Sequence, residues 1–301
     1  MTPRVRLFAD RDYTGFVRIR RLAEQRDISV ALAREQDGRW DHSRYEQVRV
    51  VAVDEEDAPL GYGEIHHEPS RFDPRRYFLR LAVDPRLRAE LDERSAKIAC
   101  LWSDDGTACR EFIVRRGFIE VIRSYEQVVA LATAPLQIAA AEEAVRANGI
   151  RIESLSELIA RQGNDSLKRV HVLYTASRVD QPTLGTVTAR LFEHWRREVF
   201  DELHALPDAY FVAGDGERLI GCSAVHESGE DVLRILITGV LPEYRRRGIA
   251  RVLKLRVHAW ARAHGYREIH TSTANVAVVA LNTSLGYAIV GSWGGYELAI
   301  R

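Results

Sequence analysis

The chain has 301 residues and no formal net charge, because 43 Lys and Arg are matched by 43 Asp and Glu. At about 150 residues per domain this length predicts two domains, and a hydrophobic fraction of 46% excludes disordered and fibrous classes. The charge balance argues against a protein that mainly binds nucleic-acid phosphates, and three scattered cysteines exclude a disulfide framework. No apolar run reaches the ~20 residues of a membrane span and the first residues are not a signal peptide, so we expect a soluble, cytoplasmic protein.

In the first half, hydrophobic periodicity predicts alternating strands and helices. The expected strands are residues 5–8, 49–53, 61–66, 77–83, 98–102 and 125–131. The expected helices are residues 13–35, residues 89–95 and a segment through 112–115. Small residues at 132–135 form a linker, which divides the chain into domains at 1–131 and 132–301.

The second half repeats this order of elements. Its expected strands are residues 150–153, 210–213, 219–226, 233–240, 268–273 and 296–300. Its expected helices are residues 136–148, segments from 155 onward with the clearest at 186–203, and then 249–264 and 276–285. Arg116-Gly117-Phe118 in the first half and Leu285-Gly286-Tyr287 in the second occupy the same place, which indicates an old duplication.

The most informative segment, residues 240–250, joins a predicted strand to a predicted helix. A helix N-terminus presents unpaired backbone amides, and the small residues Gly248 and Ala250 allow a diphosphate to approach them closely. Arg245, Arg246 and Arg247 would add charge-assisted contacts to phosphate oxygens. Taken alone, the pattern favours an ordinary solvated basic turn.

The helix that follows has one apolar face and one basic face. The basic face carries Arg251, Lys254, Arg256 and Arg262 and has no acidic residue. A nucleic-acid interface is the alternative to a solvated face, but aromatic side chains are not interleaved with these residues. The apolar face is expected to pack on the sheet, with the residues Ile249, Val252, Leu253, Val257, Trp260 and Ala261.

Two motifs in this order resemble the Gcn5-related N-acetyltransferase (GNAT) superfamily. The first is Arg245-x-x-Gly248-x-Ala250, and the second is Asn275 followed by Asn282-x-x-Leu285-Gly286-Tyr287. The resemblance covers at least residues 150–301, and the first half has the same element order. It implies an α/β (α+β) fold of two tandem GNAT-like domains, each with a mixed, mostly antiparallel sheet flanked by helices.

The resemblance also implies a binding site for acetyl-CoA that needs no metal. Backbone groups of Thr238, Gly239 and Val240 would pair with the pantetheine arm, and the Val240 amide would stabilise the oxyanion. Asn275 would contact the pantetheine or the acyl end, although capping of the next helix is an equal alternative. The pyrophosphate would be held by the backbone amides of Arg245, Arg246, Arg247, Gly248, Ile249 and Ala250.

The sequence departs from the family pattern at both proton-transfer positions. Asn282 stands where many members have a tyrosine that serves as general acid; an amide can hydrogen-bond the sulfur but cannot deliver a proton. The alternative role for Asn282 is to brace its helix. Arg234 stands where some members have a base glutamate, which leaves as nearby base candidates only His226, Glu227, Glu230 and Asp231.

The first half departs further. Val83 and Gly117 are 34 positions apart, whereas the equivalent Val240 and Gly286 are 46 apart. The missing residues fall where the diphosphate loop belongs, so we expect a degenerate first copy without this loop.

The combined interpretation is an acyl-CoA-dependent N-acyltransferase, most simply an N-acetyltransferase that transfers acetyl from acetyl-CoA to an amine by direct attack. The alternative is a non-catalytic acyl-CoA-binding or scaffold protein, because both proton-transfer residues are missing. No residue pattern specifies the acceptor amine or an oligomeric state.

Overall fold

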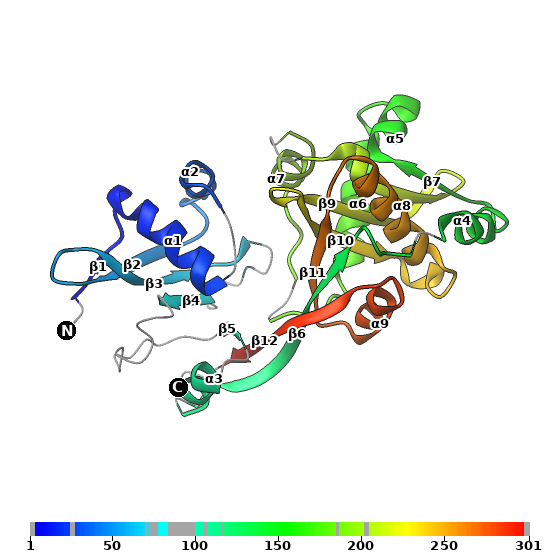
Figure 1. The fold of residues 1–301 in the computed structure, drawn as a ribbon. Coiled ribbons are helices and arrows are strands. Elements are labelled where there is room, and N and C mark those ends of the chain that lie inside the picture. Colours follow the sequence, from blue (N-terminus) through cyan, green and yellow to red (C-terminus); the bar gives the residue numbers. More distant parts are fainter. Residues whose placement is uncertain are drawn as a thin grey trace. The chain divides into compact units, whose positions relative to one another are not determined.

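The computed structural model describes residues 4–24, 28–69, 72, 78–83, 100–104, 107–115, 117–135, 137–184, 187–201 and 205–297. They form two compact units (Figure 1). The first unit comprises Met1–Ile122, Leu184–Thr188 and Trp293–Arg301, and the second comprises Arg123–Thr183 and Ala189–Ser292. The units therefore divide the chain before the predicted boundary at 131/132, and the last strand contributes residues to both.

The first unit is a mostly antiparallel sheet with helices packed on it. Its strands are ordered β1-β2-β3-β4-β5, and only β4 and β5 run parallel. Residues 293–297 of the last strand pair with β5, from Trp293 opposite Asp104 to Glu297 opposite Cys100. The elements are β1 (Arg4–Leu7), η1 (Asp10–Asp12), α1 (Tyr13–Glu24), α2 (Val30–Gly38), β2 (Gln47–Val53), β3 (Pro59–His66), β4 (Phe78–Val83), β5 (Cys100–Asp104) and α3 (Thr107–Arg115).

The helix predicted at 13–35 is two helices. α1 ends at Glu24, and Ser29 starts α2 by accepting a hydrogen bond from the Leu32 amide at 3.1 Å. A serine in extended conformation is a strong N-cap, which explains the restart. The predicted helix at 89–95 and the place of the missing loop both lie outside the described residues.

A buried ion-pair group braces the first unit. The Arg49 guanidinium donates to Glu64 on β3 at 2.7 Å and to Asp37 on α2 at 3.0 Å, and it lies 4.4 Å from the centroid of the Phe16 ring. Burial alone raises the pKa of Glu64, but Arg80 and Arg49 outweigh it and hold that pKa below its usual value. The charge of Arg49 therefore compensates two carboxylates inside the unit.

We expect Arg49→Leu to destabilise the protein by about 2–4 kcal/mol, because it leaves the buried Glu64 with Arg80 alone and removes the cation from the partly exposed Asp37. Arg4→Leu is the matched control: Arg4 pairs with Asp57 at the surface, and its loss should cost at most about 1 kcal/mol. Urea unfolding of both variants measures the difference. Equal destabilisation by the two substitutions would contradict the bracing role of Arg49.

The second unit contains the chemically informative segments. Its strands are ordered β6-β11-β10-β9-β8-β7, and only β10 and β11 run parallel. β6 and β12 each cross from one unit to the other. The elements are β6 (Ile119–Ala130), α4 (Ile138–Arg146), β7 (Ile150–Ser154), α5 (Leu155–Gln162), α6 (Ser166–Arg178), α7 (Phe192–Arg196), a π-helical turn η4 (Arg197–Asp201), η5 (Pro207–Ala209), β8 (Phe211–Asp215), β9 (Arg218–Gly229), β10 (Val232–Val240), η6 (Pro242–Tyr244), α8 (Ile249–Ala263), β11 (Glu268–Thr273), α9 (Val276–Ser284) and β12 (Ala288–Glu297).

Helices cover both faces of this sheet. Along β8, Phe211 and Ala213 pack in one apolar cluster with α8, whereas Val212 packs in another with residues of α5, α6 and α7. Such alternation is the period-two geometry of a strand buried on both sides. The architecture is thus the mixed, mostly antiparallel sheet flanked by helices that the resemblance implied.

Two predictions in this unit are wrong in extent. The helix predicted at 186–203 is described only at residues 192–201, and the last strand begins at Ala288 rather than at 296. Trp195, the centre of the short helix, is fully buried against Tyr174 and Tyr210, so tertiary packing rather than helix length fixes this segment.

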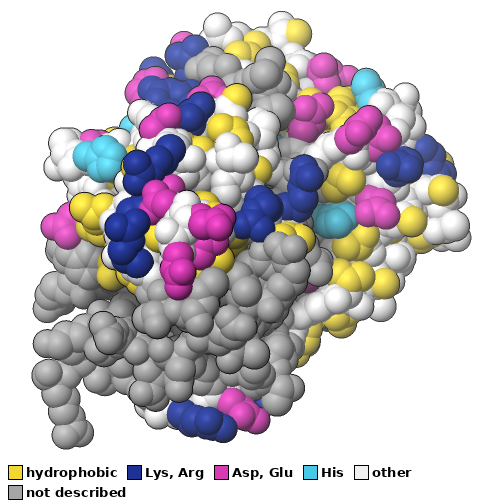
Figure 2. All heavy atoms as spheres, turned by 60° about the vertical axis from the view of Figure 1, so that its left-hand side comes forward, with side chains coloured by type: hydrophobic (Ala, Val, Ile, Leu, Met, Phe, Trp, Pro, Cys, Tyr) yellow, Lys and Arg dark blue, Asp and Glu magenta, His cyan; other side chains and the backbone are white. Residues whose placement is uncertain are grey.

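Charges of both signs are intermixed on the face drawn in Figure 2, in agreement with the zero net charge. Within the described residues, no helix is both long and apolar enough to cross a membrane.

Candidate functional site

The site is built where the ladder between β10 and β11 stops. These strands pair only from Val232 opposite Glu268 to Arg234 opposite His270. On its other side β10 stays paired with β9 as far as Val240 opposite Gly221. From Ile235 onward the edge of β10 that faces β11 therefore has no ladder partner among the described residues, and we refer to the space beside this edge as the gap.

The Val240 amide points toward this gap. The next amide, that of Leu241, donates to the Ile220 carbonyl on β9 at 2.9 Å. Backbone groups of an antiparallel pair alternate between facing the partner and facing away, so the amide of Val240 faces away from β9. By the same alternation the backbone N–H and C=O of Thr238 also point into the gap.

Gly239 allows α6 to approach the end of β10. A Cβ atom built on Gly239 would lie 2.4 Å from the Cβ of Ser177, which no side chain tolerates. On the opposite face the Thr238 hydroxyl lies 2.9 Å from the Ser223 hydroxyl. The three predicted residues Thr238, Gly239 and Val240 are thus brought together at one strand end with their neighbours closely packed.

The loop after Val240 has the backbone geometry of an anion cradle. Arg246 and Gly248 both have positive φ, +64° and +79°, and α8 begins at Ile249 without a side-chain cap. The first amide that bonds back into the helix is that of Val252, which donates to the Gly248 carbonyl at 3.1 Å. The amides of Ile249 and Ala250 precede it and have no carbonyl of the helix to bond. Alternating left-handed residues before a helix N-terminus make a concave set of amides that suits a phosphate.

The three arginines of the loop have different roles. The Arg245 side chain donates from Nε to the Val240 carbonyl at 3.0 Å and pairs with Asp180 at 2.9 Å, so it braces the strand end rather than extending toward a ligand. Arg247 donates to the Glu243 carbonyl at 3.1 Å and stacks over the Tyr244 ring. Arg246 is exposed and makes no hydrogen bond or ion pair with any residue that the structure describes. Of the predicted guanidinium contacts, that of Arg246 is the one the geometry leaves available.

Asn275 caps α9. Its side-chain oxygen accepts hydrogen bonds from the amides of Ala277 at 3.0 Å and Val278 at 3.3 Å. The structure therefore supports the capping alternative, and a contact between Asn275 and the donor stays a prediction.

Asn282 is fully buried, with 0% of its surface exposed. Its amide nitrogen donates to the Gln127 side chain on β6 at 2.8 Å, which ties α9 to the sheet. A side chain without solvent exposure cannot reach the sulfur of a bound donor in this conformation. The structure favours the bracing role, and we do not carry Asn282 forward as a catalytic residue.

The base candidates near the β9–β10 hairpin are far from the strand end. Val232 and Val240 are the two ends of β10, separated by about 26 Å at ~3.3 Å per residue. Asp231 pairs with Arg267 at 3.3 Å, and Glu227 accepts a hydrogen bond from Tyr266 at 2.6 Å. Asp231 and Glu227 are thus engaged with other side chains, whereas His226 lies opposite Arg234, where some family members have their base. A base role for any of His226, Glu227, Glu230 and Asp231 stays a prediction.

A buried polar group on α8 was missed by the sequence analysis. Lys254, expected on the basic face, is only 1% exposed, and His258 one turn later is completely buried. The His258 ring bonds the Tyr287 hydroxyl at 3.0 Å, and the Lys254 ammonium lies 5.3 Å from the centroid of the Tyr287 ring. Burial lowers the pKa of Lys254 to about 7 and that of His258 to about 3. The one sequence signal was Leu255, which lies outside the predicted apolar face and indicates a helix covered on a second side.

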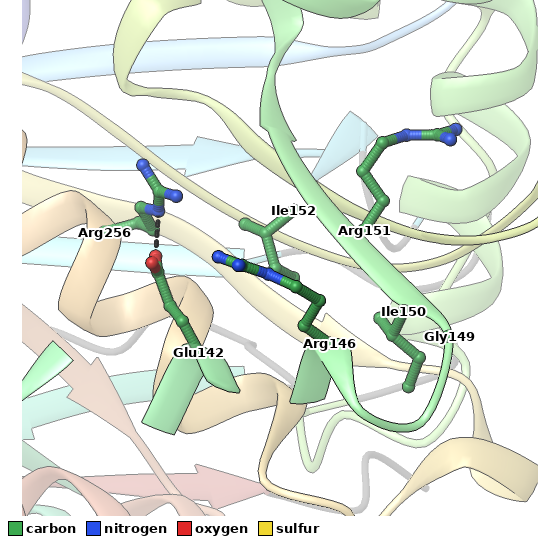
Figure 3. Close-up of a pocket in the computed structure, with 7 residues that line it drawn as sticks. All are labelled: Glu142, Arg146, Gly149, Ile150, Arg151, Ile152 and Arg256. Carbon is green, nitrogen blue, oxygen red and sulfur yellow. Dashed lines mark ion pairs between the residues drawn. The ribbon is translucent and has the colours of Figure 1, made fainter. Parts of the chain in front are cut away.

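A separate cavity of about 340 Å³ lies between α4, β7 and α8 (Figure 3). Arg256 forms an ion pair with Glu142 at one side of it, and Arg146 and Arg151 also line it. No residue of the loop at 240–250 lines this cavity, so it is not part of the strand-end site. Among the described residues, no group of three or more His, Cys, Asp or Glu side chains is arranged to hold a metal ion.

Residues 173–287 match the acetyltransferase (GNAT) family. The matched span includes the open end of β10, the loop with Gly248 and the helix capped by Asn275. These residues belong to the GNAT family. The family's members are acetyltransferases, which supports acyl transfer as the chemistry of this domain.

Solved structures show the same fold over nearly the whole chain. A GCN5-related N-acetyltransferase from Sphaerobacter thermophilus is 14% identical with a TM-score of 0.70, covering 99% of this chain and 97% of that one. A tandem GNAT protein from the clavulanic acid biosynthesis pathway is 12% identical with a TM-score of 0.66, covering 99% of this chain and 98% of that one. No curated protein matches the sequence. The GNAT domain thus lies in a chain with the fold of a tandem GNAT protein. Sequence identities this low support a shared fold and nothing more specific.

We expect Gly248→Glu to abolish CoA binding, because the side chain would fill the phosphate cradle and add like charge. Gly265→Glu is the matched control: Gly265 lies just beyond the other end of α8 with φ +84°. A Cβ there would meet open space, and at Gly248 it would make only an ordinary contact with Val145 at 3.8 Å. Both variants carry a left-handed backbone cost of about 1–2 kcal/mol, so their melting temperatures should fall together. Calorimetric titration with CoA separates them, and equal binding by both variants would contradict the cradle.

We expect Asn282→Ala to lower stability by about 1–3 kcal/mol, because it leaves the buried side-chain oxygen of Gln127 without its donor. Gln127→Ala should give the same pattern, and the double variant should cost less than the sum of the two. Melting temperature and turnover are measured on the same samples. A lower rate per folded molecule in Asn282→Ala would return Asn282 to the reaction.

Proposed function

We propose that the GNAT domain is an acyl-CoA-dependent N-acyltransferase, most simply an N-acetyltransferase that uses acetyl-CoA and an amine. The observation that carries the proposal is the pairing of an open strand end with an uncapped helix N-terminus directly after it. The first offers backbone groups to an amide-containing arm, and the second offers amides to a diphosphate.

In this proposal the chain's own groups position and polarise the donor. The backbone groups of Thr238, which face away from β9, orient the pantetheine arm in the gap beside β11. The Val240 amide donates to the thioester oxygen and stabilises the negative charge that develops there when the amine attacks. Arg245, held by Asp180, fixes the Val240 carbonyl and thus the peptide bond to Leu241 that directly follows the Val240 amide.

No described side chain is assigned as a base, so the attacking amine must be neutral when it binds. The amine forms the new C–N bond, the C–S bond breaks, and the amine proton passes to solvent. The rate should therefore rise with pH as the acceptor amine loses its proton and then level off.

The second candidate function is a non-catalytic acyl-CoA-binding or scaffold protein. The burial of Asn282 favours it, since the position of the family's acid is turned into the core. It would keep the diphosphate cradle and lose turnover.

Two measurements on the whole chain separate these functions. Calorimetry should give one CoA per chain, because the cradle has its residues in the second half only; two equivalent sites would contradict this. Thiol release from acetyl-CoA with a broad panel of amines should then show turnover. Binding without turnover supports the scaffold, and the absence of binding overturns both functions.

A further inference from the structure

Lys254 is an unusual residue to find inside the GNAT domain. It is 1% exposed, and the structure records no carboxylate paired with its ammonium among the residues it describes. The contact it does make is with the face of the Tyr287 ring. An unpaired buried ammonium is costly, so a lysine at this place points to a function that outweighs the cost.

The titratable groups around Lys254 are not able to neutralise it. His258 on the same helix is a neutral ring bonded to the Tyr287 hydroxyl, and burial raises the pKa of Tyr287 far above neutrality. The charged groups on α8 itself have other partners: Arg251 bonds Ser284, Arg256 pairs with Glu142 of α4, and Arg262 donates to the carbonyls of Leu131 and Ala134. So do charged groups on the strands beneath the helix: Arg234 of β10 pairs with Glu126, Glu227 of β9 bonds Tyr266, and Asp215 of β8 bonds Tyr244.

Lys254 stands on the helix whose N-terminus forms the phosphate cradle. It follows Ile249, the first residue of α8, by five positions, which is about 7.5 Å along the helix axis. Helical side chains also lean toward the N-terminus of their helix. Because Lys254 is enclosed by protein, salt and water screen its attraction to an anion in the cradle only weakly.

We propose that Lys254 is a buried positioning cation for the acyl donor: it releases its proton readily in the free domain, holds a proton from solvent more tightly when the diphosphate of CoA occupies the cradle, and thereby strengthens binding. This inference rests on the proposed function, because it needs the cradle to hold the diphosphate. The proton returns to solvent when the donor leaves.

The direction of the pH dependence follows from two protonation states. Without ligand, burial places the pKa of Lys254 at about 7. One unit of negative charge on the order of 10 Å away, at an effective dielectric constant of about 20, would raise that pKa by about one unit. Below the lower value Lys254 is charged in both states, and above the higher value it is neutral in both. Between them CoA affinity should fall with rising pH, on the order of tenfold in total.

The test is calorimetric titration at pH 7.5 in buffers of different ionisation enthalpy, with CoA and with dephospho-CoA as probes. Dephospho-CoA lacks the 3′-phosphate, whose own titration would otherwise contribute protons. We expect the wild-type protein to take up about half a proton per bound molecule of either probe. Lys254→Met should bind more weakly and take up none of this proton.

Two further variants keep the test decisive. Arg251→Met removes a cation nearer the cradle that never loses its proton, so affinity should fall while proton uptake stays. Lys254→Arg keeps a permanent charge and should bind without uptake. Equal proton uptake by wild type and Lys254→Met, in folded protein, overturns the inference and leaves the proposed function intact. No CoA binding by the wild type overturns both.

Unfolding provides an independent measurement if Lys254→Met alters the fold. A lysine that is neutral in the folded domain regains its proton on unfolding, so stability should rise with pH between about 7 and 9. In Lys254→Met the slope of the unfolding free energy against pH should be smaller by the contribution of one proton. An unchanged slope would mean that Lys254 is charged when buried, and the inference would be wrong.

Discussion

The early end of the β10–β11 ladder is the constraint on which the site depends. Parallel strands that pair for three residues and then part leave one edge of β10 open while β9 holds the other edge in register. The open edge would be a weak point if the strand end could move. Arg245 prevents this by joining the Val240 carbonyl to Asp180 after α6, so the loop that begins α8 also fixes the strand that precedes it.

α8 connects this strand end to the interior of the domain. α4 covers it on one side and the sheet on another, and both Val252 and Leu255 are buried as a result. A helix covered on two sides has few places for polar side chains, yet Lys254 and His258 stand one turn apart at a third, enclosed position. Burying these two side chains lowers the stability of the domain, and both lie on the helix whose N-terminus forms the cradle. His258 is accounted for by its hydrogen bond to Tyr287, and for Lys254 our proposal is the charge of a ligand.

The features that could be predicted from the sequence are those that depend on a local pattern of residues. β11 has the predicted bounds, Glu268–Thr273, because a short alternating run between two helices leaves little freedom. The loop with Gly248 was found for the same reason: a glycine with positive φ before a helix is a local requirement. The partners that decide side-chain roles are distant in sequence. Asp180 is 65 positions from Arg245, and Gln127 is 155 from Asn282, so no window of sequence could show that Arg245 braces a strand or that Asn282 faces the core.

The burial of Asn282 does not by itself decide between an enzyme and a scaffold. A general acid matters most when the leaving group is strongly basic, and a thiolate is weakly basic, with an ordinary pKa of about 8.5 for a cysteine side chain. Such a group can depart near neutral pH without receiving a proton at the moment the C–S bond breaks. What a transferase cannot dispense with is stabilisation of the charge on the thioester oxygen, which is the largest single contribution in acyl transfer. The group in question is a backbone amide at Val240, held by β9 and by Arg245. Loss of the acid side chain therefore removes only a group that assists departure of the thiolate. The Val240 amide at the strand end still stabilises the charge on the thioester oxygen, which the reaction requires.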